Sequence, residues 1–185
     1  MKTYHTKGQP PFRHFNYGCS GSGLTNKLSD VDYMVLHIDS TYKLQDYPED
    51  VDVWTLTEFQ AMLDAHDLKA LEVYYHNFDT FYNVFEMEFK LNKDKLRRSV
   101  SATCSNSYVK AKKKLRQGDK YIGLKSYWHC IRILTMFTHL AKYKHFNPAN
   151  FKDKLFDVYH NIMDCMNLPH EGDELFKLLE IDYHH

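Results

Sequence analysis

The chain of 185 residues is 43% hydrophobic and 26% charged with a formal net charge of zero, a composition that excludes disordered and fibrous proteins. No apolar run reaches the length of a bilayer span, and residues 1–12 lack the apolar stretch of a signal peptide, so we expect a cytoplasmic protein with no membrane partner. The four cysteines are scattered without a CxxC pair, which excludes a disulfide framework and a zinc site and indicates reduced thiols.

Two strands are expected in the first half of the chain. Residues 31–38 (VDYMVLHI) form a short, β-branched and nearly continuous apolar run, which is typical of a buried strand. Residues 50–56 (DVDVWTL) alternate, so Asp50 and Asp52 would share one face of a second strand and the intervening valines the other. Both predicted strands therefore carry aspartates at or near their beginning.

A helix is expected directly after the second strand. Thr55 and Glu58 have the spacing of a capping box, and apolar residues at helical spacing continue to about residue 75. Residues 79–90 alternate only in part, and their pattern fits either an irregular strand or part of a helix.

The second half of the chain is predicted to be helical, with turn residues between the apolar stripes. A mixed first half followed by a helical second half indicates an α+β (α/β) protein of two closely packed subdomains, residues 1–90 and 91–185. The expected helices are residues 105–117, 121–143, 151–166 and 173–181.

Charge is distributed unevenly between these halves. Residues 1–90 contain 7 basic and 14 acidic residues, whereas residues 91–185 contain 17 and 10. The basic stretch 110–116 (KAKKKLR), with tyrosines nearby, fits an RNA or DNA acceptor, the tail of a bound triphosphate, or merely a solvated helix face. The 12 histidines form no HExxH motif or tight cluster, so we assign none of them to a metal.

Asp30 and Asp32 indicate a metal site. In an extended segment their carboxylates project from the same side, and two such charges require a cation between them. Hard oxygen ligands favour Mg²⁺ or Mn²⁺ over zinc. Asp52 on the second predicted strand is the expected third carboxylate, with Asp50 as the alternative.

A glycine- and serine-rich turn, residues 18–23 (GCSGSG), comes shortly before this pair of aspartates. Small residues allow backbone N–H groups and serine hydroxyls to approach an anion closely. A triphosphate is an anion that commonly binds to proteins as a complex with Mg²⁺ or Mn²⁺.

This combination resembles the DNA polymerase β-like nucleotidyltransferase superfamily, whose signature is a glycine-serine turn, about ten residues, and then Asp-x-Asp. More narrowly, SDVDYMV followed by residues 50–75, with the pair Leu71 and Glu72, is similar to the small predicted nucleotidyltransferases of bacteria and large bacteriophages. The resemblance extends more weakly through SYVKAKKKL and KSYWHCIRIL and covers roughly residues 15–140.

The resemblance implies a minimal nucleotidyltransferase core, with a short mixed sheet flanked by helices, in residues 1–90. It also implies transfer of a nucleoside monophosphate from an NTP to a hydroxyl of RNA, protein or a small molecule, with release of pyrophosphate. Asp30, Asp32 and Asp52 would hold two Mg²⁺ or Mn²⁺ ions, and Asp52 would also assist deprotonation of the attacking hydroxyl. The residues expected to bind nucleotide are Gly18, Cys19, Ser20, Ser22, Gly23, Ser29 and Lys125.

Two alternatives stay open at the level of sequence. Cys19 stands where the superfamily has a serine, and a thiol is a poor donor to phosphate, which fits a catalytically impaired relative that only binds NTP or nucleic acid. Arg132 and His139 match the loose Arg-x(4–6)-His pattern of HEPN ribonuclease domains, small helical domains often paired with minimal nucleotidyltransferases. The base of the donor, the acceptor and the oligomeric state have no readable motif.

Overall fold

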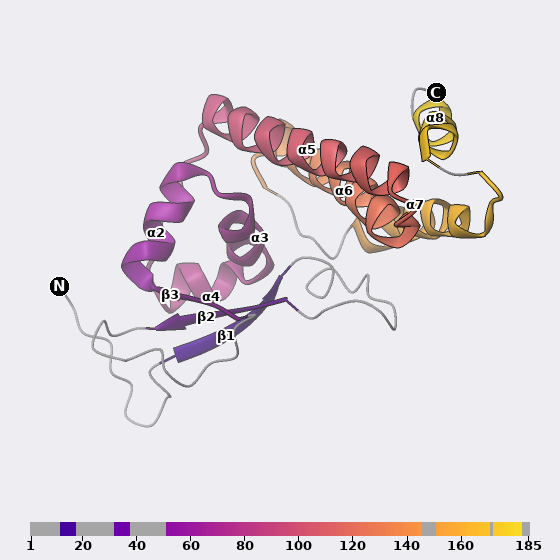
Figure 1. Cartoon of the computed structure of the whole chain (residues 1–185). Coiled ribbons are helices and arrows are strands. Elements are labelled where there is room, and N and C mark those ends of the chain that lie inside the picture. Colours follow the sequence, from indigo (N-terminus) through magenta and orange to yellow (C-terminus); the bar gives the residue numbers. More distant parts are fainter. Residues whose placement is uncertain (1–11, 18–31, 38–50, 146–150, 171, 183–185) are drawn as a thin grey trace. The chain divides into compact units, whose positions relative to one another are not determined.

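A computed structural model describes residues 12–17, 32–37, 51–145, 151–170 and 172–182 (Figure 1). The chain divides into two compact units, Met1–Lys90 and Leu91–His185. Within the described ranges, none of the helices combines the length and the hydropathy that a bilayer span requires.

The first unit contains a three-stranded sheet in the order β1-β2-β3. Strand β2 (Asp32–His37) pairs antiparallel with β1 (Phe12–Tyr17) and parallel with β3 (Val51–Thr55). The two strands predicted from sequence are therefore present. Strand β1 was not predicted, because FRHFNY has no regular alternation of apolar and polar residues.

Three helices follow in the first unit: α2 (Leu56–Ala65), α3 (Leu68–His76) and α4 (Phe78–Asn83). The prediction of one helix to residue 75 is wrong. The helix ends at His66, which adopts left-handed backbone angles (φ 61°, ψ 39°), and Asp67 begins α3 by accepting a hydrogen bond from the backbone N–H of Ala70 at 3.1 Å. The ambiguous segment 79–90 is helical only through Asn83, the end of α4, and continues as irregular chain.

The core of this unit is aromatic and lies between the sheet and its helices (Figure 1). The ring of Phe81 stacks on Phe59 of α2 at 4.9 Å and lies 5.0 Å from Phe15 of β1 and 5.7 Å from Tyr74 of α3. Because Phe81 is fully buried, it joins α2, α3, α4 and the sheet in a single packed cluster.

The second unit is built on two long helices, α5 (Lys93–Arg116) and α6 (Lys120–Tyr143), which pack side by side (Figure 1). Gly118 turns the chain between them with φ 78°, and a Cβ on Gly123 would lie 2.6 Å from Leu115 Cγ, so only glycine permits this close approach of the helices. Helix α5 begins twelve residues earlier than predicted because Asn92 caps it. The first turns of the helix are strongly polar and carry little apolar pattern from which the helix could be predicted.

The remaining elements complete the helical unit. They are α7 (Lys152–Asp164), a short 3₁₀ helix (Cys165–Asn167) and α8 (Gly172–Asp182). The hydroxyl of Tyr127 on α6 donates to the backbone carbonyl of Leu179 on α8 at 2.9 Å, and Trp128 packs edge-on to Tyr159 of α7 at 5.2 Å. The chain thus belongs to the broad α+β class, with a small sheet and a predominance of helix.

Replacing Thr55 with alanine will lower the free energy of unfolding by about 1 kcal/mol at neutral pH, because the predicted capping box is present. The Glu58 carboxylate accepts from the Thr55 N–H at 2.8 Å and from the Thr55 hydroxyl at 2.9 Å. Urea unfolding followed by circular dichroism measures the loss.

These two hydrogen bonds, the backbone one first, lower the pKa of Glu58 in the folded protein. A carboxyl group whose pKa is lowered on folding stabilises the folded protein at pH values above its unfolded-state pKa. This stabilisation disappears as the pH falls through the folded-state pKa. The difference between the wild type and Thr55→Ala should therefore be smaller at about pH 3 than at about pH 7. An equal or larger difference in acid would show that Glu58 does not contribute as a carboxylate.

Candidate active site

The pairing of β2 with β3 places two of the predicted metal ligands on one face of the sheet. Met34 of β2 is the partner of Asp52 on β3, and paired residues share a face. Asp32 precedes Met34 by two positions, so strand alternation puts position 32 on the same face, at the beginning of β2. Parallel pairing in this register places positions 32 and 52, which are 20 residues apart in the sequence, on the same face of the sheet.

Lys69 forms an ion pair with the candidate third carboxylate. Its Nζ lies 2.9 Å from Oδ2 of Asp52, with 55% of the Lys69 side chain and 28% of the Asp52 side chain exposed. Lys69 stands in the first turn of α3, where the helix dipole disfavours a cation. The pair with Asp52 offsets that cost, and it brings a positive charge to the face that carries the aspartates.

Sequence reasoning missed Lys69 as a site residue. A signal was available, since Asp67 has the character of a helix cap and a lysine two positions later is unusual so close to a helix N-terminus. Glu72, quoted only as part of the resemblance, is 3% exposed and lies one turn after Lys69 on α3. A carboxylate so deeply buried is uncommon, and Glu72 lies in the interior of the first unit.

Most of the predicted nucleotide-binding residues lie outside the described part of the chain. This applies to Asp30 and to the alternative third carboxylate Asp50, and also to Gly18, Cys19, Ser20, Ser22, Gly23 and Ser29. Lys125 is described: it lies on α6 in the second unit, where its ammonium sits 6.0 Å from the centre of the Tyr121 ring.

The donor chemistry of this face suits a hard divalent cation. Among the described residues there is no group of three His, Cys, Asp or Glu side chains that would by itself hold a metal ion. Asp52 supplies a partly exposed carboxylate that already pairs with one positive charge, and position 32 lies on the same face of the sheet by backbone register. Carboxylate oxygens without thiolate or imidazole fit Mg²⁺ or Mn²⁺.

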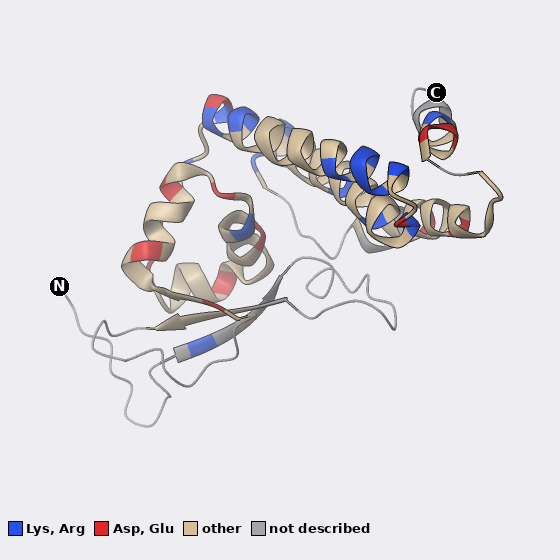
Figure 2. Ribbon diagram, in the orientation of Figure 1, with Lys and Arg blue, Asp and Glu red and all other residues tan. Residues whose placement is uncertain are grey.

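Basic residues gather along α5 (Figure 2), and two of those in the stretch 110–116 form ion pairs within the second unit. Lys114 contacts Asp119 at 3.1 Å and Arg116 contacts Asp173 at 2.6 Å. The hydrogen bond from Lys114 lowers the pKa of Asp119, and the hydrogen bond from Arg116 lowers the pKa of Asp173. Both pairs are solvent-exposed, so they contribute little stability but do compensate two of the cations.

The other cations of the stretch 110–116 differ in their surroundings. The Lys112 ammonium lies 5.2 Å from the centre of the Phe176 ring on α8, so this side chain covers an apolar surface. Lys110 and Lys113 are exposed on α5. The positive surface that α5 offers to a polyanion is therefore smaller than the sequence indicates.

Of the two candidate nuclease residues on α6, Arg132 is buried and His139 is partly exposed. Arg132 is 2% exposed, with a guanidinium nitrogen 3.8 Å from the Met136 sulfur and another 3.5 Å from Nδ1 of His129. The ring of His139 packs against Tyr143 with centroids 4.4 Å apart. Residues that cut RNA must reach its phosphates, so this burial favours a packing role for Arg132.

Comparison of the chain with protein-family models, curated proteins and solved structures found no match.

Proposed function

We propose that this protein is a metal-dependent nucleotidyltransferase, which moves a nucleoside monophosphate from an NTP to a hydroxyl group of an acceptor and releases pyrophosphate. The observation that carries the proposal is the parallel register of β2 and β3, which puts position 32 and Asp52 on one sheet face with the Lys69 cation at the Asp52 carboxylate. Carboxylates clustered in this way bind the ions that accompany triphosphates.

The reaction follows from these groups. The acceptor hydroxyl oxygen forms a bond to the α-phosphorus of the NTP, and the bond from that phosphorus to the β-bridging oxygen breaks. Asp52 is the group that accepts the hydroxyl proton on a carboxylate oxygen, and the leaving group departs as pyrophosphate. Mg²⁺ or Mn²⁺ ions, when held by Asp30, Asp32 and Asp52, supply charge stabilisation to the attacking and leaving oxygens.

Lys69 adds a positive charge beside this reaction. Its ammonium neutralises Asp52 when no metal ion is bound, and its exposed, flexible side chain can turn to a phosphate oxygen once a metal ion replaces it. The turn at residues 18–23 and Ser29 are proposed to hold the triphosphate through backbone N–H groups and hydroxyls.

RNA is the acceptor that the charge of the second unit favours. Lys110 and Lys113 are exposed on one helix and no acidic side chain occurs between residues 95 and 118. Phosphate contacts of this kind give salt-dependent affinity without sequence preference. Protein and small-molecule hydroxyls are the other acceptor classes that a labelling experiment would separate from RNA.

The test is to incubate the protein with each α-labelled NTP, Mg²⁺ or Mn²⁺ and cell extract, and to follow transfer of label. We expect label to move to an extract component with the wild type and not with the Asp32→Asn/Asp52→Asn double variant. Nuclease and protease treatment of the product then identifies the acceptor class. Metal-dependent NTP binding without transfer would instead support the impaired relative, and the absence of both would refute the proposal.

Replacing Lys69 with methionine will tighten binding of Mn²⁺ by up to about fivefold, because the ammonium no longer competes for the Asp52 carboxylate. The effect is modest because the pair is exposed to solvent. Mn²⁺ binding measured by electron paramagnetic resonance reports it without reference to activity. Lys90→Met, which removes an exposed lysine from the same unit, is the matched control and should leave Mn²⁺ affinity unchanged. Weaker or equal Mn²⁺ binding by Lys69→Met would show that Lys69 does not compete with the metal.

A further inference from the structure

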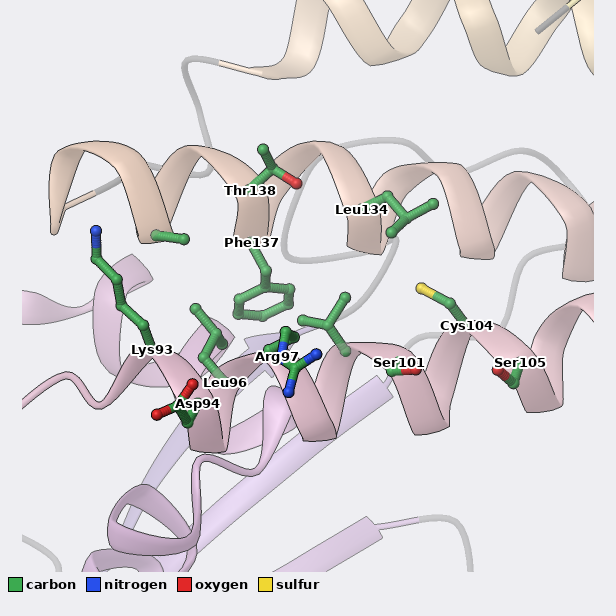
Figure 3. A pocket seen from close by; sticks show the side chains of 12 residues that line it. Lys93, Asp94, Leu96, Arg97, Ser101, Cys104, Ser105, Leu134, Phe137 and Thr138 are labelled. Carbon is green, nitrogen blue, oxygen red and sulfur yellow. The ribbon is translucent and has the colours of Figure 1, made fainter. Parts of the chain in front are cut away.

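A pocket of about 560 Å³ lies between α5 and α6 in the second unit (Figure 3). Its volume falls within the range of small-molecule sites. It is entirely separate in sequence from the carboxylates of the first unit, and neither the basic stretch nor the predicted nucleotide-binding residues line it. The lining residues from α5 occur between Lys93 and Ser105, and those from α6 between Leu134 and Ala141.

The floor of this pocket is apolar and its edges are polar. Leu96 and Phe137 are 2% and 1% exposed and, in Figure 3, extend toward one another from the two helices. Leu134, at the other end, is 45% exposed, which is a large apolar area to leave in water. An apolar floor that ends in an exposed leucine is suited to hydrocarbon rather than to a sugar or a polar peptide.

The two ends of the pocket differ in charge. Lys93 and Arg97 are exposed at the end where α5 begins, with Asp94 as the single acidic residue among the residues that line the pocket. The opposite end, around Cys104, Ser105 and Leu134, has no charged lining residue. The site therefore presents cations at one end and an uncharged, largely apolar channel at the other.

The pocket is also elongated. Its α5 lining runs over the thirteen residues from Lys93 to Ser105, a length of about 18 Å at the rise of an α-helix. An extended chain covers about 3.6 Å for every three bonds, so a chain of about twelve carbons is about 13 Å long and fits within this length from the cationic end. A planar ring system would fill only part of such a shape.

We propose that the groove between α5 and α6 binds a free fatty acid, with the carboxylate at Lys93 and Arg97 and the hydrocarbon chain along Leu96 and Phe137 toward Leu134. Charge complementarity fixes the orientation of the ligand, and burial of methylene groups supplies the affinity. The site stands independently of the proposed nucleotidyl transfer, since it uses none of the residues assigned to that reaction.

The test is isothermal titration calorimetry of the full-length protein with monomeric laurate. We expect saturable binding of one laurate per chain, and binding of octanoate weaker by about tenfold or more because it buries fewer methylene groups. The Lys93→Gln/Arg97→Gln variant should bind laurate about tenfold less tightly, since it loses the partners of the carboxylate. Absence of saturable laurate binding, or equal affinity for laurate and octanoate, would overturn the proposal.

A matched pair of variants distinguishes binding in the groove from nonspecific binding of laurate to apolar surface. Leu134→Glu places a negative charge in the apolar end and should abolish laurate binding, whereas Val109→Glu, which alters another exposed apolar residue on α5 outside the pocket, should bind like the wild type. Equal binding by both variants would overturn the site. Two further results would also overturn it. In the first, the protein binds phosphatidylglycerol vesicles but not laurate, and Leu134→Glu abolishes the vesicle binding. In the second, the protein sediments as a dimer that Leu134→Glu dissociates and that laurate does not affect.

Discussion

Replacing Asp52 with asparagine will reduce nucleotidyl transfer by about 1,000-fold or more, measured as label moved from an α-labelled NTP per unit time. The change keeps the shape of the side chain and removes its charge, so the variant loses both a metal ligand and the acceptor of the hydroxyl proton. Because the side chain is 28% exposed and its partner Lys69 is more exposed still, the fold should survive the change.

Asp79→Asn is the control for this experiment. It removes one exposed carboxylate from the same unit, on α4, and should leave the rate within about twofold of the wild type. If Asp52→Asn transferred label at the wild-type rate, the third carboxylate would have to be a different residue, and Asp50→Asn would then be the variant to measure. If Asp52→Asn and Asp79→Asn were both folded and inactive, the loss of activity would follow the total charge of the protein and not the loss of a particular site residue.

Replacing Phe81 with alanine will destabilise the first unit by about 3–5 kcal/mol, measured by urea unfolding. The ring is fully buried and contacts Phe15, Phe59 and Tyr74, which come from a strand and two helices, so its loss leaves a cavity that no single element can close. Hydrogen exchange should consequently rise in α2, α3 and the sheet.

The neighbouring residue provides the control for this second prediction. Tyr82 is 56% exposed and its ring stacks on the exposed ring of Phe78, so Tyr82→Ala should change the free energy of unfolding by no more than about 1 kcal/mol. A similar loss of stability in the two variants would show that the aromatic cluster is not packed as described. A loss confined to α4 would show that Phe81 holds only its own helix.

Local features of this protein could be predicted from the sequence because each depends on residues a few positions apart. The capping box of Thr55 and Glu58 is closed by hydrogen bonds across three residues, and the alternation of β3 follows from the geometry of any strand. Helices α6, α7 and α8 were found within a few residues because each carries an apolar stripe. The prediction that Asp32 and Asp52 belong to one site rests on the sequence as well, and the backbone register puts both positions on one face of the sheet.

Tertiary structure alone decided how those residues meet. The shared face of position 32 and Asp52 requires β2 and β3 to pair in parallel with Met34 opposite Asp52, and the contact of Lys69 with Asp52 requires the chain to break at His66 and restart at Asp67. The burial of Arg132 and the groove between α5 and α6 likewise depend on which face each helix turns to its neighbour. Periodicity gives the faces of an element, but the partner of each face is set by packing between segments distant in sequence, and no local pattern encodes that choice.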